Sequence, residues 1–222
     1  MKTPSFIAAS FLLGFSFSSA ATLATYAFGS GPSTLPSTSG VTATAITYGS
    51  GLGTPQTSAA TFAPSGPSAL GLVTATATPT TVSAAITANS FFTFTLTPSA
   101  GSAVELTEFT FWANYSGDTT AANQLALQIN TGSGYQTIGT TTFDVTGAAS
   151  PGKFFSIPIT GLGQVTGAAD FRVVMYDSAG VNWTSFTRMD DLTINGNVIP
   201  EPSALLLLGI SGLLPLRRRR SR

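Results

Sequence analysis

Alternating hydrophobic and polar positions mark the middle of the chain. In FFTFTLT, residues 91–97, Phe92, Phe94 and Leu96 share one face of an extended strand, and threonines occupy the other face. This period of two recurs along the chain, whereas no segment carries a hydrophobic stripe of helical period. Further strands are predicted at 22–28, 41–48, 104–113, 124–130, 139–145, 153–160, 171–177 and 184–194.

Turn-forming residues separate the predicted strands. The sequences PSAG, NYSGD, NTGSGY and DSAG each place Gly, Asn, Asp or Pro where the chain must reverse. Short strands rich in Thr, Val and Phe, divided by such turns, predict an all-β fold, an antiparallel β-sandwich of jelly-roll type. A β-barrel is the alternative topology.

Two segments depart from the alternating pattern. Residues 29–40 and 49–71 are rich in Pro, Ser and Gly, which predicts long loops or a partly disordered flank. We therefore expect a single β-sandwich body over residues 21–198, with these two segments as low-complexity loops.

Composition excludes several classes of function. The chain has no cysteine and no histidine, which rules out disulfides, Cys/His zinc sites, thiol nucleophiles and a Ser-His-Asp triad. Residues 21–200 hold three basic residues against eight acidic ones, a net charge of −5. A body with so few cations lacks the electrostatic footprint for a polyanion, so a nucleic-acid partner is not expected.

The first 20 residues have the features of a secretory signal peptide. Lys2 precedes an apolar run over 6–17, and small residues at Ser18 and Ala20 suit a cleavage site. Cleavage is expected after Ala20, with Ala21 nearly as suitable. A buried first helix fits less well, because the run is short and ends in small residues rather than a cap. A signal peptide implies the Sec translocon as a partner.

The chain ends in a short apolar segment followed by a cluster of arginines. Residues 203–216 would form a helix of roughly 21 Å, shorter than the ~30 Å hydrocarbon core of a bilayer. A permanent single-pass anchor would therefore need bilayer thinning or snorkelling arginines, and a transient stop in the membrane fits better. The positive-inside rule keeps the cluster cytoplasmic and places the body beyond the inner membrane. The cluster is Arg217, Arg218, Arg219 and Arg220.

Residues 199–222 resemble a known sorting signal. The triplet Pro200, Glu201 and Pro202, an apolar helix and an arginine cluster follow one another as in the PEP-CTERM signal of Gram-negative bacteria. The resemblance implies that an exosortase in the inner membrane recognises this tail and cleaves near the triplet. The body would then pass to the cell surface, the outer envelope or the extracellular matrix, in association with exopolysaccharide.

The segment 91–198 also resembles a body domain common among PEP-CTERM proteins. Its opening, middle and closing motifs match residues 92–101, 106–111 and 190–196. This likeness implies a β-sandwich and carries no assigned activity.

Carboxylates are the candidates for catalysis and for metal binding. Glycoside hydrolysis needs two carboxylates about 5–9.5 Å apart, and Glu105 and Glu108 would lie on opposite faces of a strand unless a bulge intervenes. We interpret the two glutamates as solvated strand residues rather than as a catalytic pair, so we do not expect the protein to be an enzyme. Asp190 or Asp191 could enter a structural calcium site, the alternative being a pair satisfied by backbone amides or by Arg188. No other cofactor is expected.

Aromatic residues beside predicted turns are the candidates for glycan binding, because a flat side chain stacks on the apolar face of a sugar ring. Trp183 and Tyr135 are the candidate glycan-binding residues. Trp112 continues a strand and is expected to pack in the core or on a sheet. The sequence therefore favours a non-enzymatic exported surface protein, with a carbohydrate-binding β-sandwich as the alternative.

Overall fold

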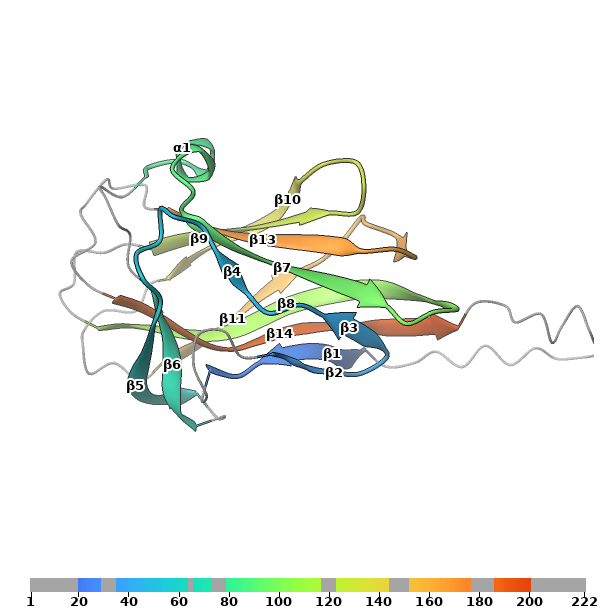
Figure 1. The fold of residues 1–222 in the computed structure, drawn as a ribbon, viewed down its shortest axis with the longest axis horizontal. Coiled ribbons are helices and arrows are strands. Elements are labelled where there is room, and N and C mark those ends of the chain that lie inside the picture. The colour runs from blue at the N-terminus through green and yellow to red at the C-terminus, as the bar shows by residue number, and fades with distance from the viewer. Residues whose placement is uncertain are drawn as a thin grey trace, which may run out of the picture.

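The described strands form two sheets that pack face to face (Figure 1). The computed structural model describes residues 20–28, 35–63, 66–72, 79–116, 123–143, 152–176 and 186–200. Within these ranges, no helix is long and apolar enough to cross a membrane. The predicted signal peptide, the PEP-CTERM helix and the arginine cluster lie outside the described residues.

The larger sheet has eight described strands, and every pairing in it is antiparallel. Its main order is β11-β8-β14-β1-β2, with β12 also on β8 and the β5/β6 hairpin on β14. The strands are β1 (Ala21–Tyr26), β2 (Ser37–Thr38), β5 (Gln56–Ala63), β6 (Gly66–Leu72), β8 (Ser102–Ser116), β11 (Lys153–Pro158), β12 (Gln164–Val165) and β14 (Phe186–Pro200).

The smaller sheet has six described strands, again paired antiparallel. Its order is β10-β9-β13-β7-β3, with β4 also on β7. The strands are β3 (Val41–Ala43), β4 (Thr47–Tyr48), β7 (Phe91–Pro98), β9 (Asn123–Asn130), β10 (Gln136–Phe143) and β13 (Ala169–Tyr176). The predicted antiparallel β-sandwich of jelly-roll type is confirmed.

Several local expectations differ from the structure. The segments predicted as loops, 29–40 and 49–71, contain β2, β5 and all of β6 except Leu72, because these Ser-, Ala- and Gly-rich sequences give no alternating pattern. The strand predicted at 41–48 is split into β3 and β4. A helix that was not predicted, α1 (Val82–Thr87), is too short to show a helical period, and it begins where the Thr81 hydroxyl accepts a 3.1 Å hydrogen bond from the Ala84 amide.

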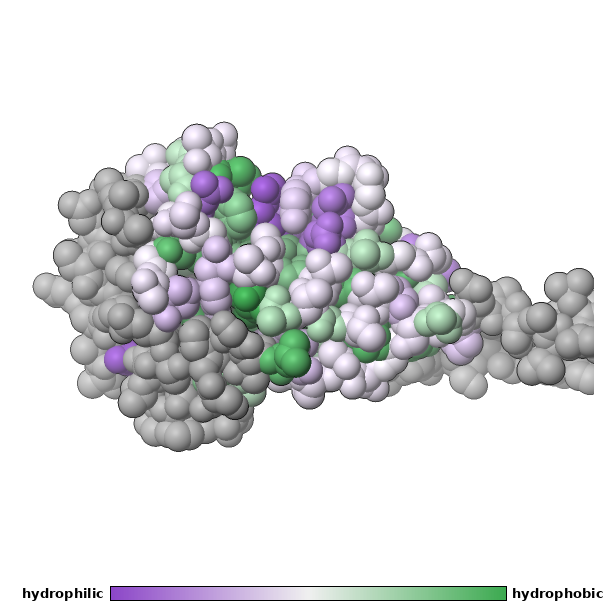
Figure 2. All heavy atoms as spheres, viewed as in Figure 1, coloured by the Kyte–Doolittle hydropathy of each residue, from purple (hydrophilic) through white to green (hydrophobic). Residues whose placement is uncertain are grey.

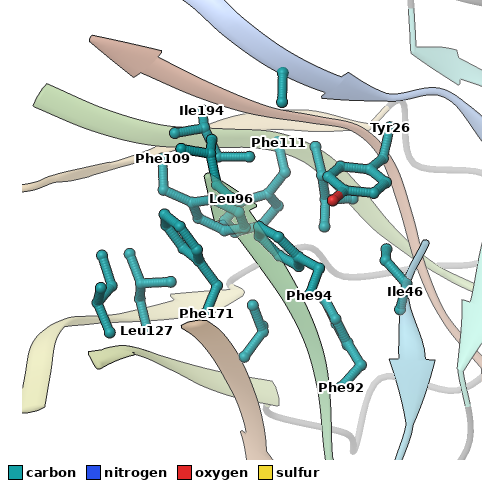
Figure 3. Packing of buried hydrophobic residues seen from close by; sticks show 14 of the residues in the cluster. Tyr26, Ile46, Phe92, Phe94, Leu96, Phe109, Phe111, Leu127, Phe171 and Ile194 are labelled. Atoms are coloured by element: carbon teal, nitrogen blue, oxygen red, sulfur yellow. The ribbon is translucent and has the colours of Figure 1, made fainter. Parts of the chain in front are cut away.

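The core is built from aromatic and aliphatic residues of both sheets (Figure 3). Phe92, Phe94 and Leu96 are 0%, 2% and 0% exposed, as their alternation with threonine predicts. In the six-stranded sheet, the rings of Phe94 and Phe171 stack with centroids 4.8 Å apart. Tyr26 of the larger sheet meets Phe94 at 4.9 Å, so aromatic contacts join the two layers.

Tyr26 gives the fold a predicted sensitivity to alkali. Its ring is buried, and its hydroxyl donates a 2.7 Å hydrogen bond to the Thr44 carbonyl. Burial raises the pKa of the Tyr26 hydroxyl above its ordinary value, and burial does the same to Tyr48. Because the folded state holds these protons more tightly, the contribution of these tyrosines to the free energy of unfolding should be fully present below about pH 10 and be lost at higher pH.

Urea unfolding at about pH 8 and about pH 11 measures this fall, and Tyr26→Phe is the test variant. The variant should lose about 1 kcal/mol at pH 8 with the hydrogen bond, yet show a smaller alkaline fall, since one of the tyrosines with a raised pKa is gone. An equal alkaline fall in both proteins would contradict the assignment to Tyr26.

Candidate functional site

The outer face of the six-stranded sheet carries polar rows beside the exposed side chain of Tyr135 and the partly buried side chain of Phe91. Because Phe171 and Val173 are buried in the core, the alternating residues Asp170 and Arg172 of β13 point away from it. Figure 2 shows strongly hydrophilic residues gathered near α1 and β10, on the side of the molecule where this sheet lies.

Strand register places further groups around these two charges. Arg172 is paired with Gln128 of β9 and Thr93 of β7, whereas Asp170 is paired with Asn130 and Thr95. The face therefore has two cross-strand rows, each with a charged residue flanked by an amide on one side and a threonine on the other.

The Arg172 guanidinium is held by several neighbours. Its Nε donates a 2.8 Å hydrogen bond to Oε1 of Gln128, whose Nε2 donates in turn to the Thr137 hydroxyl at 3.0 Å. Its Cζ lies 3.8 Å from the centre of the Tyr135 ring and 5.4 Å from that of Phe91. Burial lowers the pKa of Arg172 from its ordinary value, although a guanidinium stays charged at neutral pH.

Tyr135 reaches this position from the turn between β9 and β10. Asn130 Oδ1 accepts hydrogen bonds of 2.9 Å from the amides of both Gly132 and Gly134, and both glycines have positive φ. This turn returns the chain so that Tyr135, 36% exposed, lies over Arg172. Burial, and next the negative charge of Asp170, raise the pKa of the Tyr135 hydroxyl, while Arg172 acts in the opposite direction.

The sequence singled out Tyr135 as a candidate and gave no indication of the residues around it. The structure brings it together with Arg172, Gln128 and Phe91. These three residues come from β13, β9 and β7, respectively. A charged residue at an outward position of a predicted strand was the only available signal for Arg172. Trp183, the other predicted glycan-binding residue, lies outside the described residues.

The opposite outer face, on the eight-stranded sheet, holds another aromatic pair. Trp112 of β8 is half-buried and meets Phe154 of β11 with ring centroids 5.8 Å apart. Phe154 is 56% exposed. Trp112 thus packs on the sheet surface, one of the two positions expected for it.

A bulge in β8 changes the expected placement of the two glutamates. The register with β14 shifts between Asn195 and Gly196, so one extra residue of β8 is accommodated between Leu106 and Phe109, both of which face the core. Glu105 and Glu108 therefore share the outer face rather than lying on opposite faces. Glu108 accepts hydrogen bonds from the Ser156 hydroxyl and from Nδ2 of Asn195.

Asp190 and Asp191 lie at a second bulge, in β14. Asp190 is fully buried, and its Oδ1 accepts hydrogen bonds from the amides of Asp191 at 2.9 Å and Phe28 at 3.4 Å. Asp191 is half-exposed and has a positive φ of 49°. Searched over the described ranges, the protein has no group of three or more acidic residues placed to hold a metal ion.

These contacts lead to a prediction for calcium. Because Asp190 is engaged by backbone amides, we expect the thermal midpoint to stay unchanged when a chelator such as EDTA is added, as measured by circular dichroism. A lowered midpoint that calcium restores, and that the Asp191→Asn variant no longer shows, would instead support the calcium site considered from the sequence.

Comparison with known proteins gives structural likeness alone. No family model matches the chain, and no curated protein matches it. The CBM22-1 xylan-binding domain of Paenibacillus barcinonensis Xyn10C is similar with a TM-score of 0.48 and 11% identity, over 85% of this chain and all of that one. TmCBM61, solved with β-1,4-galactotriose, is similar with a TM-score of 0.34 and 15% identity, over 67% of this chain and 85% of that one. A Stig cyclase from Fischerella sp. TAU is similar with a TM-score of 0.39 and 9% identity, over 82% of this chain and all of that one.

Proposed function

We propose that this protein is a non-enzymatic, exported β-sandwich that binds carbohydrate on the outer face of its six-stranded sheet. The observation that carries the proposal is the Arg172 and Tyr135 stack, held by Gln128 beside two rows of hydrogen-bonding side chains. Sugar rings offer a flat apolar face for stacking and hydroxyls for amides, carboxylates and threonines.

The fixed geometry of the site favours binding. Two neighbours of Arg172 are within close contact before any ligand arrives: the amide oxygen of Gln128 at 2.8 Å and the Tyr135 ring at 3.8 Å. A ligand that uses these side chains need not immobilise them, so less conformational entropy is lost on binding.

A glycan array probed with the purified full-length protein tests the proposal, and affinity electrophoresis quantifies any binding. Tyr135→Ala should weaken binding about tenfold, a loss of about 1.4 kcal/mol, because one stacking surface is removed. Phe154→Ala is the matched control, since it removes another exposed ring on the opposite sheet. Absence of binding to any glycan, or equal losses in the two variants, would contradict the proposed site.

The same proposal includes export and sorting. β1 begins at Ala21, next to the expected signal cleavage position, and β14 ends at Pro200, the first residue of the sorting triplet. Cleavage after Ala20, and cleavage of the tail beyond Pro200, would both leave every described strand intact. The Sec translocon, an exosortase and an exopolysaccharide are the partners that this part of the proposal requires.

Intact-mass analysis of the protein recovered from inner membrane, outer envelope and medium tests the sorting. The expected species starts near Ala21, ends near Pro200 and is found outside the inner membrane. Retention of residues 217–222 in the inner membrane would identify a plain anchor and remove the surface role.

A further inference from the structure

The free edge of the Arg172 guanidinium indicates the charge of the ligand. Its Nε is committed to Gln128. Within the described part of the chain, no carboxylate forms an ion pair with it. The two Nη groups therefore keep their hydrogen-bonding capacity, and such a planar fork matches a carboxylate in a bidentate arrangement.

Asp170 sets a second condition on the ligand. It lies two residues before Arg172 on the same face of β13, a separation of roughly 6.7 Å along the strand. Its Oδ1 accepts a 2.7 Å hydrogen bond from the Thr95 hydroxyl, and its other oxygen can accept a further one. A ligand at this position must therefore offer an anionic group at one edge and a hydroxyl donor at the other.

A hexuronic acid unit meets both conditions, because its ring carries a carboxylate at one edge and hydroxyls at the opposite edge. A polyanion without hydroxyls meets only the first. The net charge of −5 over residues 21–200 opposes the binding of any polyanion, so a uronic acid polymer, with one carboxylate per ring, would depend on the specific contacts to Arg172 and Asp170. A neutral sugar leaves the Nη groups of Arg172 without their ionic partner.

We infer that the surface selects uronic-acid-containing polysaccharide, with the uronate carboxylate on the Nη groups of Arg172 and a ring hydroxyl donating to Asp170. This inference rests on the proposed function and specifies its substrate class. The Tyr135 ring holds the guanidinium in place and borders the bound sugar.

The decisive experiment compares polygalacturonate with the same polymer after methyl esterification, using the purified full-length protein and isothermal titration calorimetry. The two probes share a backbone and differ in the carboxylate charge. We expect the acid to bind at least about tenfold more tightly than the ester. Equal affinity for both would overturn the inference while leaving glycan binding intact, and binding of no glycan on the array would overturn both.

Two variants and a second polyanion test whether polygalacturonate binds at Arg172. Arg172→Lys keeps the positive charge and loses the planar fork, so it should weaken polygalacturonate binding about tenfold. Lys153→Gln removes a cation from the opposite sheet and should change nothing. Polyphosphate, whose repeating unit carries anionic charge and no hydroxyl, should bind more weakly than polygalacturonate. Equal binding of the two polymers, or an equal loss in Lys153→Gln, would show a non-specific charge effect and contradict the inference.

Discussion

Replacing Phe171 with alanine should lower the free energy of unfolding by about 3–5 kcal/mol, as large-to-small substitutions of buried aromatic residues do. Phe171 is fully buried and stacks on Phe94, with the ring planes 11° apart. Phe94 also contacts Tyr26 of the facing sheet, so the cavity would open where the two layers meet. Urea unfolding followed by circular dichroism gives the value.

Phe154→Ala is the control for this measurement. Its ring is 56% exposed and packs edge to face with Trp112 on the outer face of the sheet, so we expect a loss below about 1.5 kcal/mol. If both substitutions cost the same, the assignment of Phe171 to a shared aromatic core would be wrong.

Replacing Gly51 with alanine should also destabilise the protein, by about 1–3 kcal/mol. A Cβ at this position would lie 2.0 Å from the Ala88 carbonyl oxygen and 2.8 Å from the Asn89 carbonyl carbon, and both are backbone atoms that cannot rotate away. The Gly51 amide donates a 3.1 Å hydrogen bond to the Asn89 carbonyl, so moving the segment apart would break that bond as well.

The thermal midpoint and urea midpoint of Gly51→Ala measure this loss. Gly167→Ala is the matched control, because no atom lies within 4 Å of its added Cβ and its φ is not in the left-handed region. Similar midpoints for the two variants would show that the segment after β4 does not pack closely against residues 88 and 89.

Strand alternation predicts the fold where it is regular and fails where the chain departs from it. The buried positions of β7 follow directly from the alternation of Phe and Thr. A bulge leaves no mark in composition, so the shared face of Glu105 and Glu108 emerges only from the register of β8 against β14. The sequences of β5 and β6 are rich in Ser, Ala and Gly, as loops are, so composition does not reveal the backbone ladder that pairs them.

The candidate site was predictable to a smaller extent. Tyr135 follows a glycine-rich turn, which marks it as a surface aromatic residue. Arg172 was not identified, because its environment depends on long-range pairing of β13 with β7 and β9. A lone arginine on a strand is usually a solvated residue, and only its contacts with Gln128 and Tyr135 distinguish it.

The most direct test of carbohydrate binding at this surface is an NMR titration of backbone amides with the tightest-binding glycan of the array. The largest shifts should fall in β7, in β9 with the turn to Tyr135, and in β13 around Arg172. The outer face of the opposite sheet, around Trp112 and Phe154, should show none. Shifts concentrated around Trp112 and Phe154 would contradict the account.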